Sequence, residues 1–306
     1  LSTGLAYLSA ISAPTDEVMA LAEPLAAAGG LYATHLRSET DGIFEAMQEA
    51  FRIGRHAHAP VIVSHLKCAA AGTWGRSGEV LAALEQAGRE HPVGCDCYPY
   101  AASSSTLDLR QVTGIEILVT WSTPHPEMGG CRLAEIAADW GVAQVEAARR
   151  LQPAGAIYHC MKDEDVERIL AHPATMIGSD GLPNDPLPHP RLWGTFPRVL
   201  GHYSRDRGLF PLAEAVRKMT GLPAQRFRLS ERGLLREGWW ADLVLFDPAA
   251  VADAATFTDP VVPAHGIAAV WVNGVETYRG GATGRAGGQT LDPGSRAGRF
   301  LPRAAA

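Results

Sequence analysis

Two apolar runs that each end in a histidine restrict the possible folds of this chain more than any other feature. The runs are Leu31-Tyr-Ala-Thr-His35 and Val61-Ile-Val-Ser-His65, and each lies between segments with helical periodicity. Runs of this kind are typical of strands that are buried on both faces of a parallel sheet. Because active sites in such folds lie at the carboxyl ends of the strands, we expect both histidines on one rim.

Two imidazoles at neighbouring strand ends favour a divalent metal site, because imidazole is the commonest metal ligand among side chains. A single histidine at a strand end is more often a hydrogen-bonded structural residue, but the matched positions of His35 and His65 favour ligation. Asp180 ends a third apolar run and precedes Gly181. Its carboxylate could bind the metal or take a proton from metal-bound water, whereas a turn or helix cap is the ordinary alternative.

The order of the elements predicts the fold class, which is α/β. Strand-like and helix-like segments alternate over residues 1–98, a pattern typical of a parallel sheet or a (β/α)₈ barrel. Residues 101–160 break this alternation with a serine cluster and inserted strands. The predicted strands are 1–8, 31–35, 61–65, 92–98, 116–121, 156–160 and 174–180, and the predicted helices are 15–28, 42–56, 77–86, 133–140, 143–151, 163–171, 198–202 and 212–219.

A change in the sequence pattern near residue 233, from helix-like to strand-like segments, predicts a second domain. Residues 234–246 and 267–274 read as antiparallel strands, and Asn273-Gly274 is a strong hairpin signal. We therefore expect a partial barrel over residues 1–230 and a small β domain over residues 231–306, with the glycine-rich tail after Gly280 along the surface.

Charge and composition exclude several classes of partner. The formal net charge is −6 and no basic block occurs, which argues against a nucleic-acid or anionic-membrane surface. No apolar run approaches the roughly 20 residues of a membrane span. The 5 cysteines form no C-x-x-C pair and suggest reduced thiols in a cytoplasmic protein. Residue 1 is Leu within an apolar stretch, so we expect this chain to be the carboxyl-terminal part of something longer.

Polar residues just beyond the strand ends are candidates for substrate contact. Lys67 and Arg191 are suited to binding a substrate carboxylate, although solvated surface charge is the usual role of such residues. Tyr98, Tyr100 and the serines of 103–105 can supply hydroxyl donors, or Tyr98 can simply pack in the sheet. Arg37 and Glu39 follow His35 and are expected to orient it.

Five motifs together resemble the N-acyl-D-amino-acid deacylases (D-aminoacylases) of the amidohydrolase superfamily. The resemblance runs from residue 1 to about residue 290, and the first four motifs together are specific. They are Ala33-Thr-His-Leu-Arg-Ser-Glu39, Ser64-His-Leu-Lys67, Asp96-Cys-Tyr-Pro-Tyr100, Ile177-Gly-Ser-Asp-Gly-Leu-Pro183 and Gly238-Trp-Trp-Ala-Asp-Leu-Val-Leu-Phe-Asp-Pro248.

The resemblance implies a (β/α)₈ TIM-type barrel with a small β-sandwich, of which this chain holds strands four to eight. It implies that His35 and His65 bind zinc and that Asp180 is the general base. It further implies contacts to the substrate carboxylate, and a tyrosine that follows the fourth strand. The matching residues are Lys67, Tyr98, Ser104 and Arg191 for the carboxylate, and Tyr7 for the tyrosine.

The chain departs from the family in its metal ligands. The family's His-x-His on the first strand and its zinc-binding Cys on the second have no counterpart here, and residues 1–10 lack the lysine that many amidohydrolases carbamylate. We expect residues 1–306 alone to show little activity and to associate with themselves through an unpaired strand edge.

The main functional prediction is a zinc-dependent hydrolase that cleaves N-acyl-D-amino acids, which are small molecules, into a carboxylate and a free D-amino acid. The alternatives are hydrolysis of a cyclic amide such as a hydantoin, which the missing lysine disfavours, and a catalytically inactive fragment.

Overall fold

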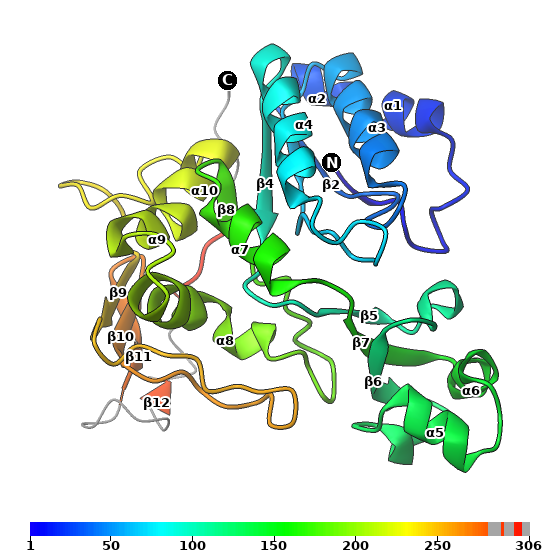
Figure 1. Ribbon diagram of the computed structural model, residues 1–306. Coiled ribbons are helices and arrows are strands. Elements are labelled where there is room, and N and C mark those ends of the chain that lie inside the picture. The colour runs from blue at the N-terminus through cyan, green and yellow to red at the C-terminus, as the bar shows by residue number, and fades with distance from the viewer. Residues whose placement is uncertain (281–288, 291–296, 302–306) are drawn as a thin grey trace.

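Five short parallel strands pair in the order β1-β2-β3-β4-β8 and form the sheet that carries the site (Figure 1). The computed structural model describes residues 1–280, 289–290 and 297–301. Thr34 of one strand pairs with Val63 of the next, which pairs with Cys95, so the carboxyl ends of these strands lie side by side. The strands are β1 (Ser2–Gly4), β2 (Tyr32–His35), β3 (Val61–Val63), β4 (Val93–Cys97) and β8 (Thr175–Ile177).

Helices alternate with these strands, as the sequence predicts. Helix α3 contacts β3, α4 contacts β4, and α7 contacts β8. The predicted apolar stripe of α3 is confirmed, since Ile43, Met47, Phe51 and Ile53 are all buried. The helices between the parallel strands are α1 (Thr15–Ala22), α2 (Pro24–Ala27), α3 (Ile43–His56), α4 (Ser77–Glu90) and α7 (Asp163–Ala171).

The segment that breaks the alternation forms a separate antiparallel sheet of three strands, in the order β5-β7-β6. In Figure 1 this sheet and its two helices stand to one side of β4 and α4. Both predicted inserted strands are confirmed. The elements are β5 (Ser103–Thr106), β6 (Glu116–Ser122), α5 (Leu133–Asp139), α6 (Gln144–Leu151) and β7 (Ala154–His159), with short 3₁₀ turns at Leu109–Gln111 and Pro126–Met128.

The chain after β8 forms helices and then an antiparallel sheet in the order β12-β11-β10-β9. The hairpin at Asn273-Gly274 is confirmed, with both residues at positive φ (51° and 81°) between β10 and β11. The described residues form one sheet here, so the second layer of the predicted sandwich stays a prediction, and most of the tail after Gly280 lies outside them. The elements are α8 (Arg191–Arg198), a π-helix (Val199–Asp206), α9 (Leu212–Met219), α10 (Gly221–Phe227), β9 (Leu243–Phe246), β10 (Ile267–Val272), β11 (Val275–Arg279) and β12 (Gln289–Thr290).

Three local predictions need correction. The strand predicted over residues 1–8 ends at Gly4, because Tyr7 begins a series of turns whose amides donate to nearby carbonyls. The helix predicted over residues 198–202 lies within a longer pair, α8 and the π-helix, which starts at Arg191. The helix predicted over residues 15–28 divides at Pro24, whose ring nitrogen carries no hydrogen to donate.

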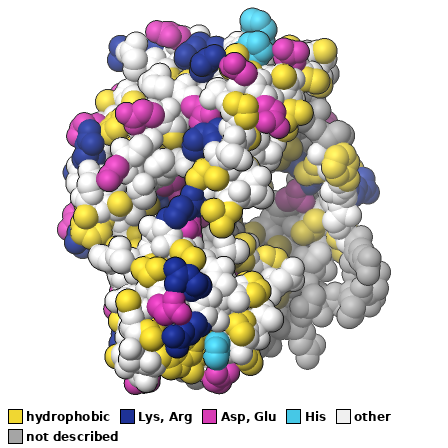
Figure 2. All heavy atoms as spheres, turned by 90° about the vertical axis from the view of Figure 1, so that its right-hand side faces the viewer, with side chains coloured by type: hydrophobic (Ala, Val, Ile, Leu, Met, Phe, Trp, Pro, Cys, Tyr) yellow, Lys and Arg dark blue, Asp and Glu magenta, His cyan; other side chains and the backbone are white. Residues whose placement is uncertain are grey.

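The parallel sheet is open, since β1 and β8 each pair on one side only among the described residues. On the face drawn in Figure 2, basic and acidic side chains are interspersed. No helix in the described ranges is long and apolar enough to cross a membrane.

Two helical glycines provide a matched test of the packing. A Cβ at Gly54 in α3 would overlap Cγ2 of Val61, whereas one at Gly88 in α4 would meet nothing within 4 Å. Gly54→Ala should therefore lower the free energy of unfolding by about 1–3 kcal/mol. Gly88→Ala should raise it by about 0.5–1 kcal/mol, because alanine loses less backbone entropy on folding. Urea unfolding monitored by circular dichroism measures both, and equal effects would contradict this packing.

Candidate metal centre

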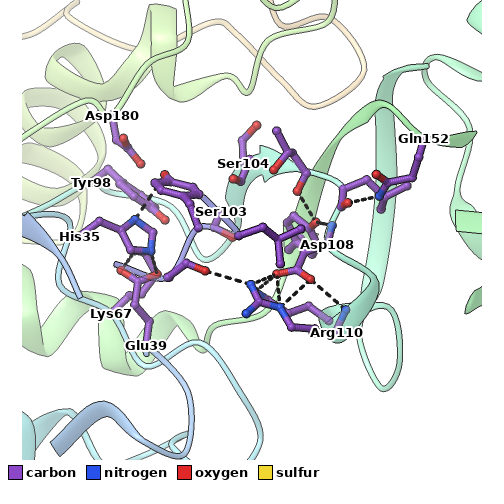
Figure 3. A pocket seen from close by; sticks show the side chains of 18 residues that line it. His35, Glu39, Lys67, Tyr98, Ser103, Ser104, Asp108, Arg110, Gln152 and Asp180 are labelled. Atoms are coloured by element: carbon purple, nitrogen blue, oxygen red, sulfur yellow. Dashed lines mark hydrogen bonds and ion pairs between the residues drawn. The ribbon is translucent and has the colours of Figure 1, made fainter. Parts of the chain in front are cut away.

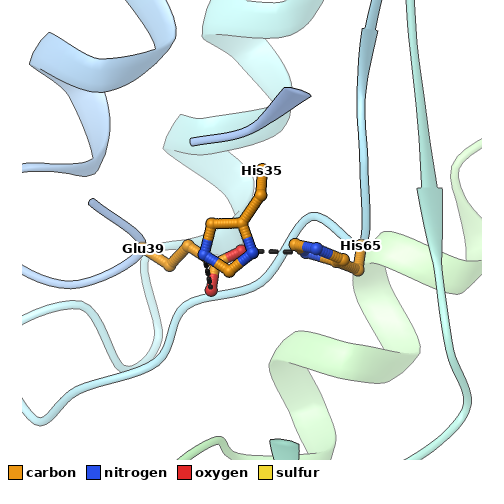
Figure 4. A group of neighbouring side chains, drawn as sticks. All are labelled: His35, Glu39 and His65. Atoms are coloured by element: carbon orange, nitrogen blue, oxygen red, sulfur yellow. Dashed lines mark ion pairs between the residues drawn. The ribbon is translucent and has the colours of Figure 1, made fainter. Parts of the chain in front are cut away.

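The two histidines at the strand ends lie together, as the sequence predicts. His35 is the last residue of β2, and His65 follows β3 by two residues in a left-handed conformation with a φ of 40°. Their ring centroids are 4.5 Å apart and the rings are nearly perpendicular (Figure 4).

Glu39 is the third member of this cluster. Its Oε1 lies 2.9 Å from Nδ1 of His65, and its Oε2 lies 3.5 Å from Nε2 of His35. One ligand atom from each of the three residues lies within 4.8 Å of the other two. Sequence reasoning gave Glu39 only an orienting role. Its position four residues after His35, in the loop that leaves β2, was the available signal.

Lys67 lies inside the cluster. Its Nζ is 2.5 Å from Oε1 of Glu39 and 2.7 Å from Nδ1 of His65, and only 4% of its side chain is exposed. Burial raises the pKa of Glu39, but Lys67 and the two imidazoles outweigh it and hold that pKa below its usual range. Lys67 therefore balances the charge of Glu39, and its contact with a substrate carboxylate stays a prediction.

The donor atoms of the cluster fit a divalent metal. Burial lowers the pKa of His35 to about 4, so its imidazole is neutral near pH 7 and keeps a lone pair for coordination. Two imidazoles and a carboxylate are the three protein ligands of many catalytic zinc sites. The ammonium of Lys67 shows that the acceptor atoms already converge on a positive charge.

Asp180 lies near the cluster but outside it. It follows β8 at a φ of 48°, and its Oδ2 is 2.9 Å from Nη2 of Arg191, whose side chain is only 1% exposed. The sequence placed Asp180 on the same rim as the histidines, and it does line the cavity that His35 lines. Its partner Arg191, predicted as a substrate contact, therefore also fixes this carboxylate.

A cavity of about 130 Å³ joins most of the predicted site residues (Figure 3). Asp108 and Arg110 lie at the end away from His35. A larger hollow of about 590 Å³ also borders His35 and Glu39. The predicted site residues that line the smaller cavity are Tyr7, His35, Lys67, Tyr98, Ser104 and Asp180.

Buried donors without partners gather at and behind one wall of this cavity, which Tyr98 and Ser104 line and against which Arg191 packs. Among the described residues, the hydroxyls of Tyr98 and Ser104 and the Nε and Nη1 atoms of Arg191 make no hydrogen bond. The guanidinium of Arg191 lies 4.5 Å from the centre of the Tyr98 ring, and its Nη2 donates to the carbonyl of Ser104 at 3.1 Å. Unpaired buried donors are costly, so this group is suited to an anionic ligand.

Tyr7 reaches the cluster from the loop after β1. Its hydroxyl is 3.4 Å from Nδ1 of His35. Arg37 holds this loop, because it donates to the carbonyls of Ile11 and Ala13 while pairing with Glu49 on α3. Arg37 therefore holds the loop that carries Tyr7, and its predicted role in orienting His35 stays a prediction.

Comparisons with known proteins find relatives that match nearly the whole chain. A model of the amidohydrolase family matches residues 12–278. A D-aminoacylase of Alcaligenes xylosoxydans xylosoxydans is 50% identical over 100% of this chain and 62% of its own length. An N-acyl-D-aspartate deacylase of the same organism is 49% identical over 96% of this chain and 60% of its own length. The chain thus spans about three fifths of the curated relatives that it matches.

Solved structures of similar proteins superpose closely on this chain. A crystal structure of a D-aminoacylase superposes with a TM-score of 0.93 at 50% identity, covering 99% of this chain and 62% of that one. The N-acyl-D-glutamate deacylase of Bordetella bronchiseptica, complexed with zinc and a phosphonate inhibitor, superposes with a TM-score of 0.89 at 48% identity, covering 93% of this chain and 60% of that one. A dihydropyrimidinase of Brevibacillus agri, 15% identical with a TM-score of 0.56, shares the fold alone.

The Lys67–Glu39 pair can be tested by comparing single and double substitutions. Glu39→Gln leaves the ammonium of Lys67 without a counter-charge, and should lower the free energy of unfolding by about 3–5 kcal/mol. Adding Lys67→Met removes the uncompensated charge and should restore most of the loss. Glu79→Gln, in an exposed pair with Arg76, is the matched control and should leave the urea midpoint unchanged. A double variant as unstable as Glu39→Gln would contradict this pairing.

Proposed function

This chain belongs to the amidohydrolase family, and on that basis we propose that it carries the metal ligands and substrate contacts of a zinc-dependent hydrolase of N-acyl-D-amino acids. The observation that carries the proposal is one cavity that His35 and Glu39 of the metal cluster border on one side, and that the buried, unpaired hydroxyls of Tyr98 and Ser104 border on the other. A metal cluster beside an anion receptor suits a substrate with an amide bond close to a carboxylate.

His35 and His65 would hold the zinc, with Glu39 beside them. The related N-acyl-D-glutamate deacylase is complexed with zinc, which supports this choice of metal. Zinc bound here would polarise the acyl carbonyl and activate a water molecule.

Asp180 would act as the general base. Its carboxylate borders the cavity beside His35, and the ion pair with Arg191 fixes its direction. It would take a proton from the attacking water and deliver it to the nitrogen of the leaving amine, which departs as the free D-amino acid.

The unpaired donors would bind the α-carboxylate of the substrate. Tyr98, Ser104 and Arg191 offer two hydroxyls and a buried guanidinium, and Lys67 borders the same cavity. A carboxylate held at this wall, with the scissile amide at the metal, leaves only one direction for the side chain on Cα. This arrangement would select one enantiomer.

The same proposal extends to the architecture. Five consecutive parallel strands with alternating helices would be strands four to eight of a (β/α)₈ barrel, within residues 1–230, and residues 231–306 would form the smaller β domain. The free edges of β1 and β8 would favour self-association. All 5 cysteines are free, which supports the predicted cytoplasmic location.

Zinc binding is the first test. The protein should bind zinc, measured by competition with a chromophoric chelator, and zinc should raise its unfolding temperature by mass action. His35→Ala and His65→Ala should each abolish both effects, whereas His56→Ala, on the exposed end of α3, should change neither. Binding that survives loss of both imidazoles would refute the site.

Turnover is the second test. With zinc present, release of free amine from N-acetyl-D-methionine, N-acetyl-D-aspartate and N-acetyl-D-glutamate should exceed release from their L-enantiomers and from a hydantoin. Asp180→Ala should lower the rate by about 10²–10⁴-fold while zinc stays bound. Faster release from the L-enantiomers or the hydantoin, or unchanged turnover by Asp180→Ala, would count against the proposal.

A further inference from the structure

Asp96 lies between the strand that precedes His65 and the strand that precedes Asp180, and the proposed reaction gives it no role. It is the fourth residue of β4, which pairs with β3 on one side and with β8 on the other. Its Oδ1 accepts a hydrogen bond of 2.9 Å from the backbone amide of His65. The reaction therefore leaves unexplained why this half-buried carboxylate accepts the backbone amide of a candidate ligand.

The turn that contains His65 is held by three consecutive backbone amides. Ser64 donates to the carbonyl of Thr34 at 3.0 Å, on the β2 side. On the β4 side, Leu66 donates to the carbonyl of Asp96 at 2.8 Å, and His65 donates to the Asp96 carboxylate. The middle amide is the only one of the three that depends on a side chain.

This middle amide belongs to a residue with a strained backbone. His65 has a φ of 40°, in the left-handed region, which is unfavourable for a residue with a Cβ. The conformation persists only where its surroundings enforce it. The hydrogen bond to Asp96 does so, because a turn with an ordinary φ would direct this amide elsewhere.

The absence of a side chain at a neighbouring glycine leaves room for the Asp96 carboxylate. A Cβ at Gly178, just after β8, would lie 2.7 Å from Oδ1 of Asp96. Gly178 is not at positive φ, so its backbone conformation does not require glycine. The space beside the Asp96 carboxylate does.

We propose that Asp96 is a positioning residue, whose Oδ1 holds the turn at His65 so that the imidazole faces Glu39 and His35 for metal binding. The inference rests on the proposed metal role of His65. It concerns Oδ1 as the acceptor of the His65 amide, and not the charge of the carboxylate.

The test compares zinc dissociation constants and apoprotein unfolding midpoints for a set of variants. Asp96→Ala leaves the His65 amide unpaired and should weaken zinc binding by at least about tenfold, in the range seen for residues that orient metal ligands. Asp96→Asn keeps the acceptor and should bind zinc within about threefold of the unsubstituted protein, a rescue that a role for the charge would not give.

Asp165 supplies the matched control. It is a buried aspartate that, like Asp96, accepts backbone amides: those of Gly75 and Ser77 at 2.7 and 3.2 Å, at the start of α4. Asp165→Ala should lower the unfolding midpoint while leaving the zinc dissociation constant unchanged. A merely structural role for Asp96 would make Asp96→Ala behave in the same way.

Gly178→Ala tests the same hydrogen bond between His65 and Asp96 by crowding the acceptor atom. Its Cβ should displace the carboxylate and weaken zinc binding, and Asp96→Ala/Gly178→Ala should bind no more weakly than Asp96→Ala, because both changes remove one hydrogen bond. If Asp96→Ala does not fold, Asp96→Asn and Gly178→Ala still decide the question.

Three results would overturn the inference. They are Asp96→Ala or Gly178→Ala binding zinc like the unsubstituted protein, Asp96→Asn binding as weakly as Asp96→Ala, and Asp165→Ala losing as much affinity as Asp96→Ala. Failure of the unsubstituted protein to bind zinc would be a separate result, and would refute the proposed function first.

Discussion

Parallel pairing in chain order is the constraint on which the rest of this structure depends. Because β2, β3, β4 and β8 run the same way and pair in sequence, whatever follows each strand arrives at one rim. His35 ends β2, whereas His65 and Asp180 follow β3 and β8, and the three residues are far apart in the sequence. One hydrogen-bonded sheet brings them to the same end, and no direct contact between them is required.

Charge balance decides the arrangement at that rim. Glu39 lies among two imidazoles and an ammonium, so its carboxylate stays ionised although it is largely enclosed. Asp180 is fixed in the same way by the buried guanidinium of Arg191. The donors of Tyr98 and Ser104 remain unpaired beside them, which leaves the site able to accept one more anion.

Local patterns were enough for the elements themselves. The apolar stripe of α3, the bounds of α7 at Asp163–Ala171 and the hairpin at Asn273-Gly274 follow from periodicity and turn chemistry that act over a few residues. The strand expected over residues 1–8 ends at Gly4 because the chain then turns into a loop. Arg37, a residue distant in sequence, holds that loop by donating to the carbonyls of Ile11 and Ala13.

The sequence alone therefore determined which residues end the strands and which chemistry they carry, because strand and helix periods are local properties. The pairings were decided only by tertiary structure: Lys67 with Glu39, Arg191 with Asp180, and Asp96 with the amide of His65. The first and third join different βα units, and Asp180 and Arg191 stand at opposite ends of the long loop between β8 and α8. Their distances depend on how the units pack, and no spacing along the chain encodes that.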